Sequence, residues 1–266
     1  MLAMVHPFLR RLRPTLHIAH RGGAALAPEN TFAAFRLAVD RFRTDMIETD
    51  VRVTSDGELV IMHDATLDRT TNGQGPVASH SWSQVAALDA GYRFDGPGRS
   101  FPFRGQRVRI PRLETVLERF PQTLFNLEVK DDLPGVEDAF AHVLRTAGAV
   151  GRVCVGSEDD AVSKRLLRAL PDACHFYPRN AVTNLIIGLR AGQTPRTDDP
   201  YDVLDIPLFY GGARLVDTQF LFRAAKIGRW VNVWTVNDRS EMEKLVAEQV
   251  GGIMTDRPDL LRDVLG

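Results

Sequence analysis

Residues 46–64 read MIETDVRVTSDGELVIMHD. The strand-like pattern at the start of this stretch recurs along the rest of the chain and decides the predicted fold. Its first part, Met46 to Val53, is an apolar, β-branched burst with polar residues between, which is typical of a strand. Ser55-Asp56-Gly57-Glu58 follows, and Asp-Gly between apolar runs is a strong hairpin signal. A two-residue turn at Asp56 and Gly57 predicts that Leu59 to His63 returns antiparallel, with the facing pairs Ser55 and Glu58, Arg52 and Ile61, and Asp50 and His63.

Bursts like Met46 to Val53 alternate with helical periodicity along the whole chain, which favours βα units around a parallel sheet. Eight strands are predicted: Thr15 to His20, Met46 to Val53, Leu124 to Lys130, Arg152 to Ser157, Cys174 to Pro178, Val203 to Leu208, Trp230 to Val236 and Gly251 to Thr255. Helices are predicted between them: Thr31 to Phe42, Leu113 to Phe120, Val136 to Thr146, Asp160 to Ala169, Ala181 to Arg190, Gln219 to Ile227, Asp238 to Gln249 and Pro258 to Val264.

Eight such units in 266 residues fit a TIM (β/α)8 barrel, whose typical size is about 250 residues. A doubly wound open sheet is the alternative, but no glycine-rich dinucleotide loop follows the first strand. We therefore expect residues 1–266 to form a single barrel domain. The segment from Asp64 to Arg109 is far longer than a usual βα loop, and we expect it to be an inserted subdomain over one end of the barrel.

Composition excludes several classes of protein. The 33 basic and 34 acidic side chains give a net charge of −1, which argues against a nucleic-acid partner. Cys154 and Cys174 are too few and too far apart in the sequence for a zinc site or a disulfide framework, and we expect them to be core residues.

The sequence also bears on membranes and location. No apolar run reaches the roughly 18 residues of a membrane span. The start of the chain, with Arg10, Arg11 and Arg13, lacks the pattern of a secretion signal, so we expect a cytoplasmic protein. An untidy segment ahead of the first strand is the preferred interpretation of this start, and weak contact with a membrane surface stays open as the alternative.

Polar side chains gather where the predicted strands end, and active sites of TIM barrels lie at that end. The first strand ends in His20-Arg21-Gly22-Gly23, and the hairpin arm ends in His63-Asp64. Glu48 and Asp50 are spaced by two, as are Glu128 and Lys130, so each pair lies on one face of its strand. The sequence therefore predicts that three carboxylates from neighbouring strands point into one mouth.

Three converging carboxylates repel one another unless a cation lies among them, and oxygen ligands suit calcium or magnesium better than zinc. Arg21 and Lys130 are placed to receive an anion such as a phosphate ester. Histidines on either side of that phosphate could act as general acid and base.

Plainer interpretations stand beside these. Each histidine alone could be a surface residue, and Glu128 with Lys130 a simple ion pair. Pro28-Glu29-Asn30-Thr31 has an obvious role as a helix N-terminal cap. Trp234, at the end of the seventh strand, could be core or a wall that packs against substrate.

These residues match a known family: the chain resembles the glycerophosphodiester phosphodiesterases, of the phospholipase-C-like TIM-barrel group. The resemblance runs from His20 to the C-terminus. Its motifs here are His20-Arg21-Gly22, Pro28-Glu29-Asn30-Thr31, Glu48-Thr49-Asp50, Asp56-Gly57, His63-Asp64, Ile110-Pro111 with Leu113-Glu114, Glu128-Val129-Lys130, Val233-Trp234-Thr235-Val236-Asn237 and Thr255-Asp256-Arg257-Pro258.

The resemblance implies a role for each of these side chains. His20 and His63 would be the acid/base pair, and Glu48, Asp50 and Glu128 would hold one divalent metal ion, Mg²⁺ or Ca²⁺. Phosphate and substrate would be bound by Arg21, Lys130, Trp234 and Glu29. The segment after His63 would correspond to the insertion that shapes the family's substrate site.

The expected activity is metal-dependent hydrolysis of a small-molecule glycerophosphodiester to an alcohol and sn-glycerol 3-phosphate, in lipid metabolism. Many members of the family have Ser-Phe after the fourth strand, whereas this chain has Gly156-Ser157-Glu158, which alters the substrate wall there. Apolar runs at Leu185 to Leu189 and Leu204 to Leu208 resemble a subgroup of lysophospholipase D enzymes acting on lysophospholipids, although a barrel helix that packs on the sheet is the preferred explanation of the first run.

Two further functions share this kind of site. An inactive phosphate-binding barrel would have lost at least one of the site residues, and none is lost. A toxin-like activity on sphingomyelin is disfavoured by the lack of a secretion signal and of a disulfide pair. The sequence leaves open the head group and acyl chain, the metal, the order in which the histidines act, water or a glycerol hydroxyl as nucleophile, and the oligomeric state.

Overall fold

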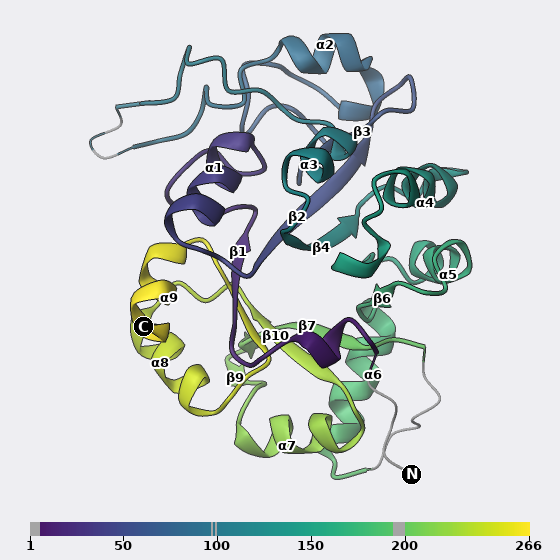
Figure 1. The fold of residues 1–266 in the computed structure, drawn as a ribbon, viewed down its shortest axis with the longest axis vertical. Helices are drawn as coiled ribbons and strands as arrows, with labels where there is room; N and C mark the ends of the chain where they lie inside the picture. The colour runs from purple at the N-terminus through teal and green to yellow at the C-terminus, as the bar shows by residue number, and fades with distance from the viewer. Residues whose placement is uncertain (1–5, 97, 99, 194–199) are drawn as a thin grey trace.

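In the computed structural model, residues 6–96, 98, 100–193 and 200–266 are described. They form a barrel of eight parallel strands with helices around its outside, which confirms the predicted TIM barrel (Figure 1). The strands follow the order β6-β5-β4-β2-β1-β11-β10-β7. Their bounds are β1 Leu16–His20, β2 Met46–Val53, β4 Leu124–Val129, β5 Val153–Gly156, β6 Cys174–His175, β7 Val203–Pro207, β10 Trp230–Trp234 and β11 Gly252–Thr255.

Helices connect the strands on the outer face, close to where the sequence periodicity predicted them. They are α1 Phe32–Arg36 with η2 Leu37–Arg41, α3 Leu113–Arg119, α4 Val136–Thr146, α5 Asp160–Ala169, α6 Arg179–Arg190, α7 Thr218–Lys226, α8 Arg239–Ala247 and α9 Pro258–Leu265. Several begin at a side-chain cap, as α5 does at Asp159 and α8 at Asp238, whose carboxylates accept hydrogen bonds from the first backbone N–H groups. In the described ranges, no helix is long and apolar enough to cross a membrane.

The barrel closes on itself between β6 and β7, the two ends of the strand order. A single bridge pairs Phe176 with Val203, and the backbone N–H of Tyr177 donates to the carbonyl of Val203 at 2.9 Å. The predicted fifth strand, Cys174 to Pro178, is longer than β6, which has only two residues. Pro178 ends the extended run because it is the N-cap of α6.

The arm after β2 forms, but its predicted register is wrong by one residue. In the structure Val51 pairs with Ile61, Arg52 with Val60 and Val53 with Leu59. The cause is the turn: Thr54 and Glu58 pair through the backbone, and Gly57 has a φ of +86°. This left-handed residue makes a three-residue loop with a bulge in place of the two-residue turn, so Asp50 bonds to Met62 rather than facing His63.

Residues 64–109 extend beyond the barrel and carry η3 Val77–Ser79 and α2 Trp82–Ala87, which lie beside β3 (Leu59–Ile61) at the top of Figure 1. The sequence did not predict these two short elements. Val60 and Met62 from the arm pack with Leu67, Val77 and Val85 in a small apolar cluster separate from those that line the barrel. The segment therefore has a core of its own.

The end of the barrel where the strands begin is closed by the N-terminal segment. Phe8 and Leu9, from η1 (Leu9–Arg11) and the residue before it, are buried against Leu16 and both cysteines. The preferred interpretation of an untidy start is therefore wrong for the described part of this segment. Cys154 and Cys174 are core residues, as expected, but strand register makes them direct neighbours on β5 and β6.

Candidate active site

The turn after β1 brings Arg21 to the mouth of the barrel. Arg21 has a φ of +50° and Gly22 of +83°, and a Cβ on Gly22 would lie 2.6 Å from the ring of Phe35. Only glycine fits at this second position, because it needs both the left-handed backbone and the missing side chain. The turn points the backbone N–H of Arg21 at Oε2 of Glu48, at 3.1 Å.

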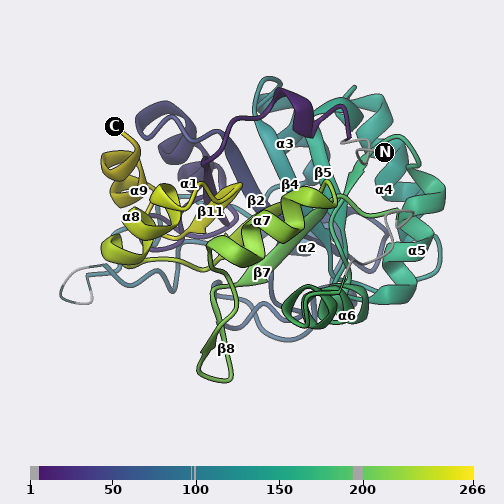
Figure 2. The ribbon, with the colours of Figure 1, turned by 90° about the horizontal axis from the view of Figure 1, so that it is seen from below.

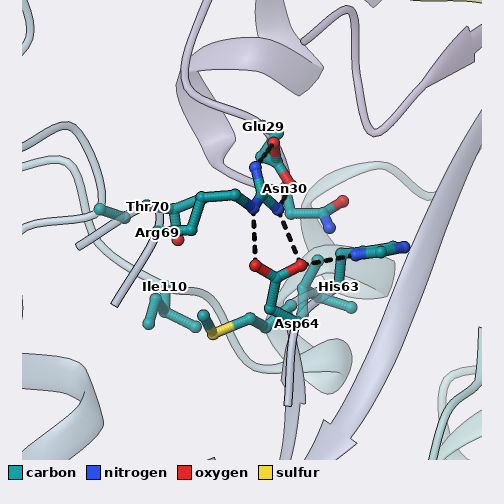
Figure 3. A pocket seen from close by; sticks show the side chains of 10 residues that line it. Glu29, Asn30, His63, Asp64, Arg69, Thr70 and Ile110 are labelled. Atoms are coloured by element: carbon teal, nitrogen blue, oxygen red, sulfur yellow. Dashed lines mark hydrogen bonds and ion pairs between the residues drawn. The ribbon is translucent and has the colours of Figure 1, made fainter. Parts of the chain in front are cut away.

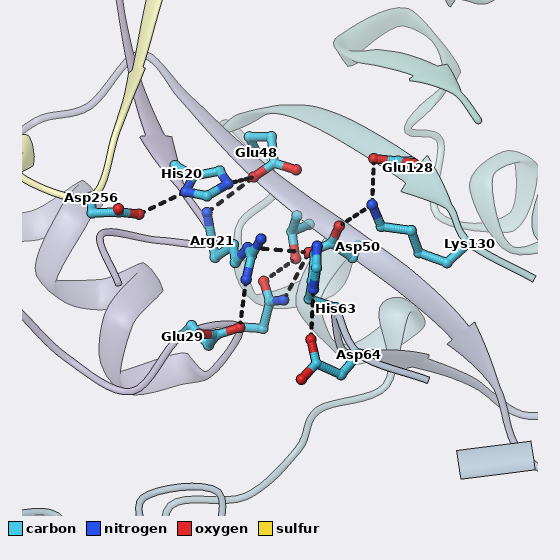
Figure 4. Close-up of polar contacts among 12 residues, drawn as sticks. His20, Arg21, Glu29, Glu48, Asp50, His63, Asp64, Glu128, Lys130 and Asp256 are labelled. Carbon is cyan, nitrogen blue, oxygen red and sulfur yellow. Dashed lines mark hydrogen bonds and ion pairs between the residues drawn. The ribbon is translucent and has the colours of Figure 1, made fainter. Parts of the chain in front are cut away.

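His20 ends β1 and is held by a carboxylate that follows the last strand of the barrel (Figure 4). Its Nδ1 lies 2.6 Å from Oδ1 of Asp256, and its Nε2 lies 3.8 Å from Oε2 of Glu48. Asp256 is itself fixed by Asn237, whose side-chain amide donates to it at 2.8 Å. Burial acts to lower the pKa of His20, but the hydrogen bond to Asp256 and the charge of Glu48 outweigh burial, so the pKa is raised.

His63 is held in the same way from the other side of the mouth. Its Nδ1 lies 2.7 Å from Oδ1 of Asp64 (Figure 3). Its side chain is 33% exposed, and burial lowers its pKa despite the nearby carboxylates of Asp50 and Asp64. The two histidines thus share one arrangement and differ in the direction of their pKa shifts.

Arg69, from the segment after the arm, binds the carboxylate that holds His63. Its guanidinium donates to Asp64 at 2.6 and 3.0 Å, and to Glu29 at 2.7 Å through two nitrogens. These bonds hold the pKa of Asp64 well below its usual range. Arg69 therefore connects residues 64–109 to the mouth of the barrel, where it lines a small pocket with Glu29, Asn30 and His63 (Figure 3).

Of the three predicted carboxylates, Glu48 lies beside His20 and Asp50 beside His63, whereas Glu128 lies beyond Asp50 and next to Lys130 (Figure 4). Lys130 Nζ lies 3.2 Å from Asp50 and 2.7 Å from Glu128. Burial and the charge of Asp50 raise the pKa of Glu48, and burial raises that of Glu128 to about 7. Burial acts to raise the pKa of Asp50 as well, but Lys130 and His63 outweigh it and lower that pKa. Burial therefore makes the charged forms of Glu48 and Glu128 unfavourable, and a further cation among these carboxylates would favour them.

Arg21 spans the other side of this cluster. Its Nη1 donates to Glu29 at 3.0 Å, and its Nε lies 3.8 Å from Oδ2 of Asp50. That Nε is buried and makes no hydrogen bond with any described residue. The neighbouring Asn30 donates to Asp50 at 3.0 Å, and Thr31 caps α1 as its motif suggested. A buried N–H without an acceptor is costly, so this group is suited to an anion brought by a ligand.

Trp234 lies apart from this cluster. It ends β10 at the same mouth, in register with Pro207, and is 37% exposed. At the end of β5, Glu158 donates its backbone N–H to Glu128 at 3.4 Å, and its carboxylate pairs with Arg179. The altered wall at Gly156-Ser157-Glu158 is therefore acidic and next to a candidate metal ligand.

Sequence reasoning missed the side chains that position the histidines. Asp64 and Asp256 stand inside family motifs, Glu29 was assigned to substrate rather than to arginine pairing, and Arg69 was not singled out. The available signal for the two aspartates was their position: Asp64 directly follows His63, and Asp256 directly follows the last predicted strand. No local signal shows that Asp256 pairs with His20, which lies 236 positions earlier.

Comparison with known proteins fits this geometry. Residues 20–260 match the model of the Glycerophosphoryl diester phosphodiesterase family. A "Glycerophosphodiester phosphodiesterase" from Caldanaerobacter subterraneus subsp. tengcongensis is 32% identical, over 93% of this chain and 96% of its own. "Lysophospholipase D GDPD1" from Homo sapiens is 26% identical, over 94% of this chain and 85% of its own.

Solved structures agree with the fold. The glycerophosphoryl diester phosphodiesterase domain of Rv2277c from Mycobacterium tuberculosis superposes with a TM-score of 0.85 at 24% identity, covering 95% of this chain and 100% of that domain. A phosphodiesterase from Oleispira antarctica, in complex with the product sn-glycerol-3-phosphate, superposes with a TM-score of 0.73 at 25% identity, covering 95% and 97%. The chain belongs to the glycerophosphoryl diester phosphodiesterase family and is a phosphoric diester hydrolase.

Proposed function

We propose that this chain hydrolyses glycerophosphodiesters to an alcohol and sn-glycerol 3-phosphate, with His20 and His63 as the acid/base pair. One observation carries the proposal: each histidine has its Nδ1 against a carboxylate, at 2.6 and 2.7 Å, which leaves both Nε2 atoms for substrate. The product seen in the Oleispira antarctica relative supports the choice of substrate.

Arg21 and Lys130 are the groups that bind the phosphate in this proposal. Arg21 offers an Nε–H without an acceptor among the described residues, and Lys130 is a buried ammonium among carboxylates. Burial acts to lower the pKa of both, but neighbouring carboxylates outweigh burial and raise the pKa of each, so both stay charged. A phosphodiester between them would meet two positive charges.

The cluster of Glu48, Asp50 and Glu128 fits a divalent cation, because its donors are all oxygens and a cation would offset the burial and the charge of Asp50 that raise the pKa of Glu48 and Glu128. These three carboxylates would hold one Mg²⁺ or Ca²⁺ ion. When bound, the ion would stabilise negative charge on the phosphate oxygens.

The chain's own residues carry the proton transfers. One imidazole accepts the proton of the attacking hydroxyl group as its oxygen bonds to phosphorus. The other imidazole donates a proton to the oxygen of the alcohol as the bond from phosphorus to that oxygen breaks. Asp256 and Asp64 stabilise whichever ring is positively charged and keep each Nε2 turned toward the substrate.

The proposal treats residues 1–266 as one catalytic unit, with residues 64–109 as part of the substrate site. Arg69 supports this assignment, since it binds both Asp64 beside His63 and Glu29 beside Arg21. Small-molecule diesters are the expected substrates.

The experiment is hydrolysis of glycerophosphocholine by untagged protein, with Mg²⁺, Ca²⁺ or chelator. Changing His20→Ala or His63→Ala should lower kcat by about 10²- to 10⁴-fold, because each removes a proton-transfer group. Chelator should abolish activity, and one of the two ions should restore it.

His142→Ala is the matched control, since this histidine is exposed on α4 and should leave kcat unchanged. Full activity in chelator would contradict the metal assignment. Activity retained in both His20→Ala and His63→Ala would contradict the acid/base assignment.

A second candidate, release of lysophosphatidate from a lysophospholipid, is favoured by exposed aromatic side chains at the mouth. The hairpin of β8 (Phe209–Tyr210) and β9 (Ala213–Arg214) follows directly on β7 and projects from the barrel (Figure 2). Phe209 and Tyr210 are 50% and 75% exposed, and Trp234 lies beside the strand that leads into them. An acyl chain could pack on such a surface.

Lysophosphatidylcholine and glycerophosphocholine separate the two candidates. If the second is correct, Phe209→Ser with Tyr210→Ser should lower kcat/KM for the lysolipid several-fold and leave that for glycerophosphocholine unchanged. Phe222→Ser, an exposed aromatic on α7, is the control. No turnover of the lysolipid by the unmodified protein would eliminate this candidate.

A further inference from the structure

A second group of metal-ligating side chains lies at the opposite end of the barrel from the active site. One ligand atom each from His6, Cys174 and Asp202 lies within 4.8 Å of the other two. Cys174 is the first residue of β6, Asp202 directly precedes β7, and His6 precedes η1. Parallel strands begin at the same end, so this group lies where the strands start and the catalytic carboxylates lie where they finish.

We propose that these residues form a structural zinc site that is independent of the catalytic site. The donors are an imidazole nitrogen, a sulfur and a carboxylate oxygen, a mixed set that suits Zn²⁺ and is unsuited to Mg²⁺ or Ca²⁺. In a tetrahedral zinc site the ligand atoms are roughly 3.3–3.8 Å apart. No pair of these three ligand atoms therefore needs to approach by more than about 1–1.5 Å.

In this proposal Cys154 is the fourth ligand, and its sulfur would have to approach the ion from outside the group of three atoms that lie within 4.8 Å of one another. It is the register partner of Cys174 on the adjacent strand β5, and each thiol influences the pKa of the other. Both side chains are buried, at 1% and 0% exposed. Two sulfurs, one nitrogen and one oxygen complete four-coordination, with ligands from β5, from β6, from the start of β7 and from the N-terminal segment.

The contacts that metal binding would replace are weak. Nδ1 of His6 accepts a hydrogen bond from the backbone N–H of Phe8 at 3.2 Å, and a rotation of the ring toward the ion would cost this bond. Asp202 accepts a bond from the backbone N–H of His175 at 3.3 Å, which leaves its second carboxylate oxygen for the ion. Both distances are at the long end of the range for such bonds.

The effect of the metal would be to fasten the N-terminal segment to the barrel. Phe8 and Leu9 lie just after His6 and cover the end of the barrel, where they pack in one cluster with Cys154 and Cys174. The same ion would join β6 to β7 through Cys174 and Asp202, at the place where a single bridge closes the barrel. We expect bound zinc to raise the Tm.

Cobalt substitution tests the site without using activity. Untagged, reduced protein freed of metal is titrated with Co²⁺ alone, and sulfur-to-cobalt charge-transfer absorption is recorded. We expect one Co²⁺ per chain to give this absorption and Zn²⁺ to displace it. The carboxylates at the mouth contain no sulfur, so a Glu48→Gln/Glu128→Gln variant should give the same absorption.

Variants identify the ligands. Cys174→Ser and Cys154→Ser should each roughly halve the absorption, because one thiolate remains in either variant. His6→Ala should weaken Co²⁺ binding more than tenfold and remove the rise in Tm caused by zinc. This variant lies outside the strands, so it keeps the test decisive even where a cysteine variant fails to fold.

The absence of sulfur-to-cobalt absorption in the unmodified protein would overturn the proposal, as would unchanged Co²⁺ affinity in His6→Ala. Unchanged absorption in Cys154→Ser would overturn the assignment of the fourth ligand. None of these results depends on hydrolysis of a diester, so the catalytic proposal stands or fails separately.

Discussion

At the mouth of the barrel, Lys130 pairs with Asp50 and with Glu128, and the pKa of Lys130 is raised. Toward the ends where the strands begin, His17 and His175 are buried as neutral rings, and burial lowers the pKa of both. The difference shows that one barrel holds two kinds of buried polar environment, a charged one at the mouth and a neutral one near the starts of the strands. The charged groups at the mouth can bind a phosphate, but each depends on a partner of opposite charge. The neutral rings depend instead on hydrogen bonds, such as the one between Nε2 of His175 and the carbonyl of Leu170 at 2.8 Å.

The largest loss of stability is expected from Lys130→Met, which removes a charged group from the mouth. Without its ammonium, Asp50 and Glu128 face each other in a site where Asp50 is almost wholly buried, and we expect a loss of about 3–5 kcal/mol in chelator. Urea unfolding measures this loss. The control is Arg239→Met, which breaks an exposed pair with Glu243 on α8 and should cost about 0.5 kcal/mol or less. Equal losses in the two variants would show that the mouth does not depend on its ions.

A smaller effect on stability is expected from His17, one of the buried neutral rings. Burial and the charge of Arg262 lower its pKa to about 4, so the native state resists protonation of this ring between pH 6.5 and 4. Its contribution to stability is complete above pH 6.5 and is lost as the pH falls. Between pH 7.5 and 5 the loss is about 2 kcal/mol, from about 1.4 kcal/mol per pH unit.

His17→Gln should remove that loss, because the amide does not titrate. Urea unfolding of both proteins at pH 7.5 and pH 5 measures the difference, which should favour the variant at the lower pH. His142→Gln, at an exposed position, should fall in parallel with the unmodified protein. Parallel behaviour of His17→Gln would mean that His17 already carries a proton in the native state.

Arg69→Ala tests the charged partners at the mouth with the smallest expected loss of stability, since the side chain of Arg69 is 48% exposed. Asp64 and Glu29 lose a shared partner, and His63 loses the anchor of its carboxylate. We expect kcat for glycerophosphocholine to fall about 10- to 100-fold with KM nearly unchanged, because misplacement of a proton-transfer group affects the chemical step. Steady-state kinetics separates the two parameters.

Arg69→Lys should recover part of the activity, since an ammonium keeps the charge but not the paired bonds to two carboxylates. Arg109→Ala, in the same inserted segment, removes a donor to the carbonyl of Leu88 and should leave kcat unchanged. A rise in KM alone in Arg69→Ala would point to a role in substrate binding instead.

The sequence predicted what depends on short-range pattern. Alternation of strands and helices predicted the barrel, and the bounds of β2 match the predicted segment. The register of its arm failed because Gly57 adopts a left-handed conformation that lengthens the turn, which composition alone does not specify. Spacing by two correctly placed Asp50 and Glu128 near Lys130, since strand geometry is regular.

Contacts between distant segments were the part that sequence could not supply. Asp256 meets His20 because β11 pairs with β1, and Cys154 meets Cys174 because β5 and β6 pair in that register. Each contact depends on which strands are neighbours and on how far one is shifted along the other. Arg69 reaches Glu29 only because its segment folds back over the mouth, which no periodicity in the chain indicates.

The single bridge between Phe176 and Val203 has a consequence for motion. Six residue pairs join β2 to β4, whereas β6 and β7 share this one bridge and the flanking backbone bonds of Asp202 and Tyr177. Local opening should therefore begin there, and amide protons along β6 and β7 should exchange with solvent sooner than those of β2 and β4. Local opening of the barrel would then separate β6 from β7, at the place where Cys174 and Asp202 lie.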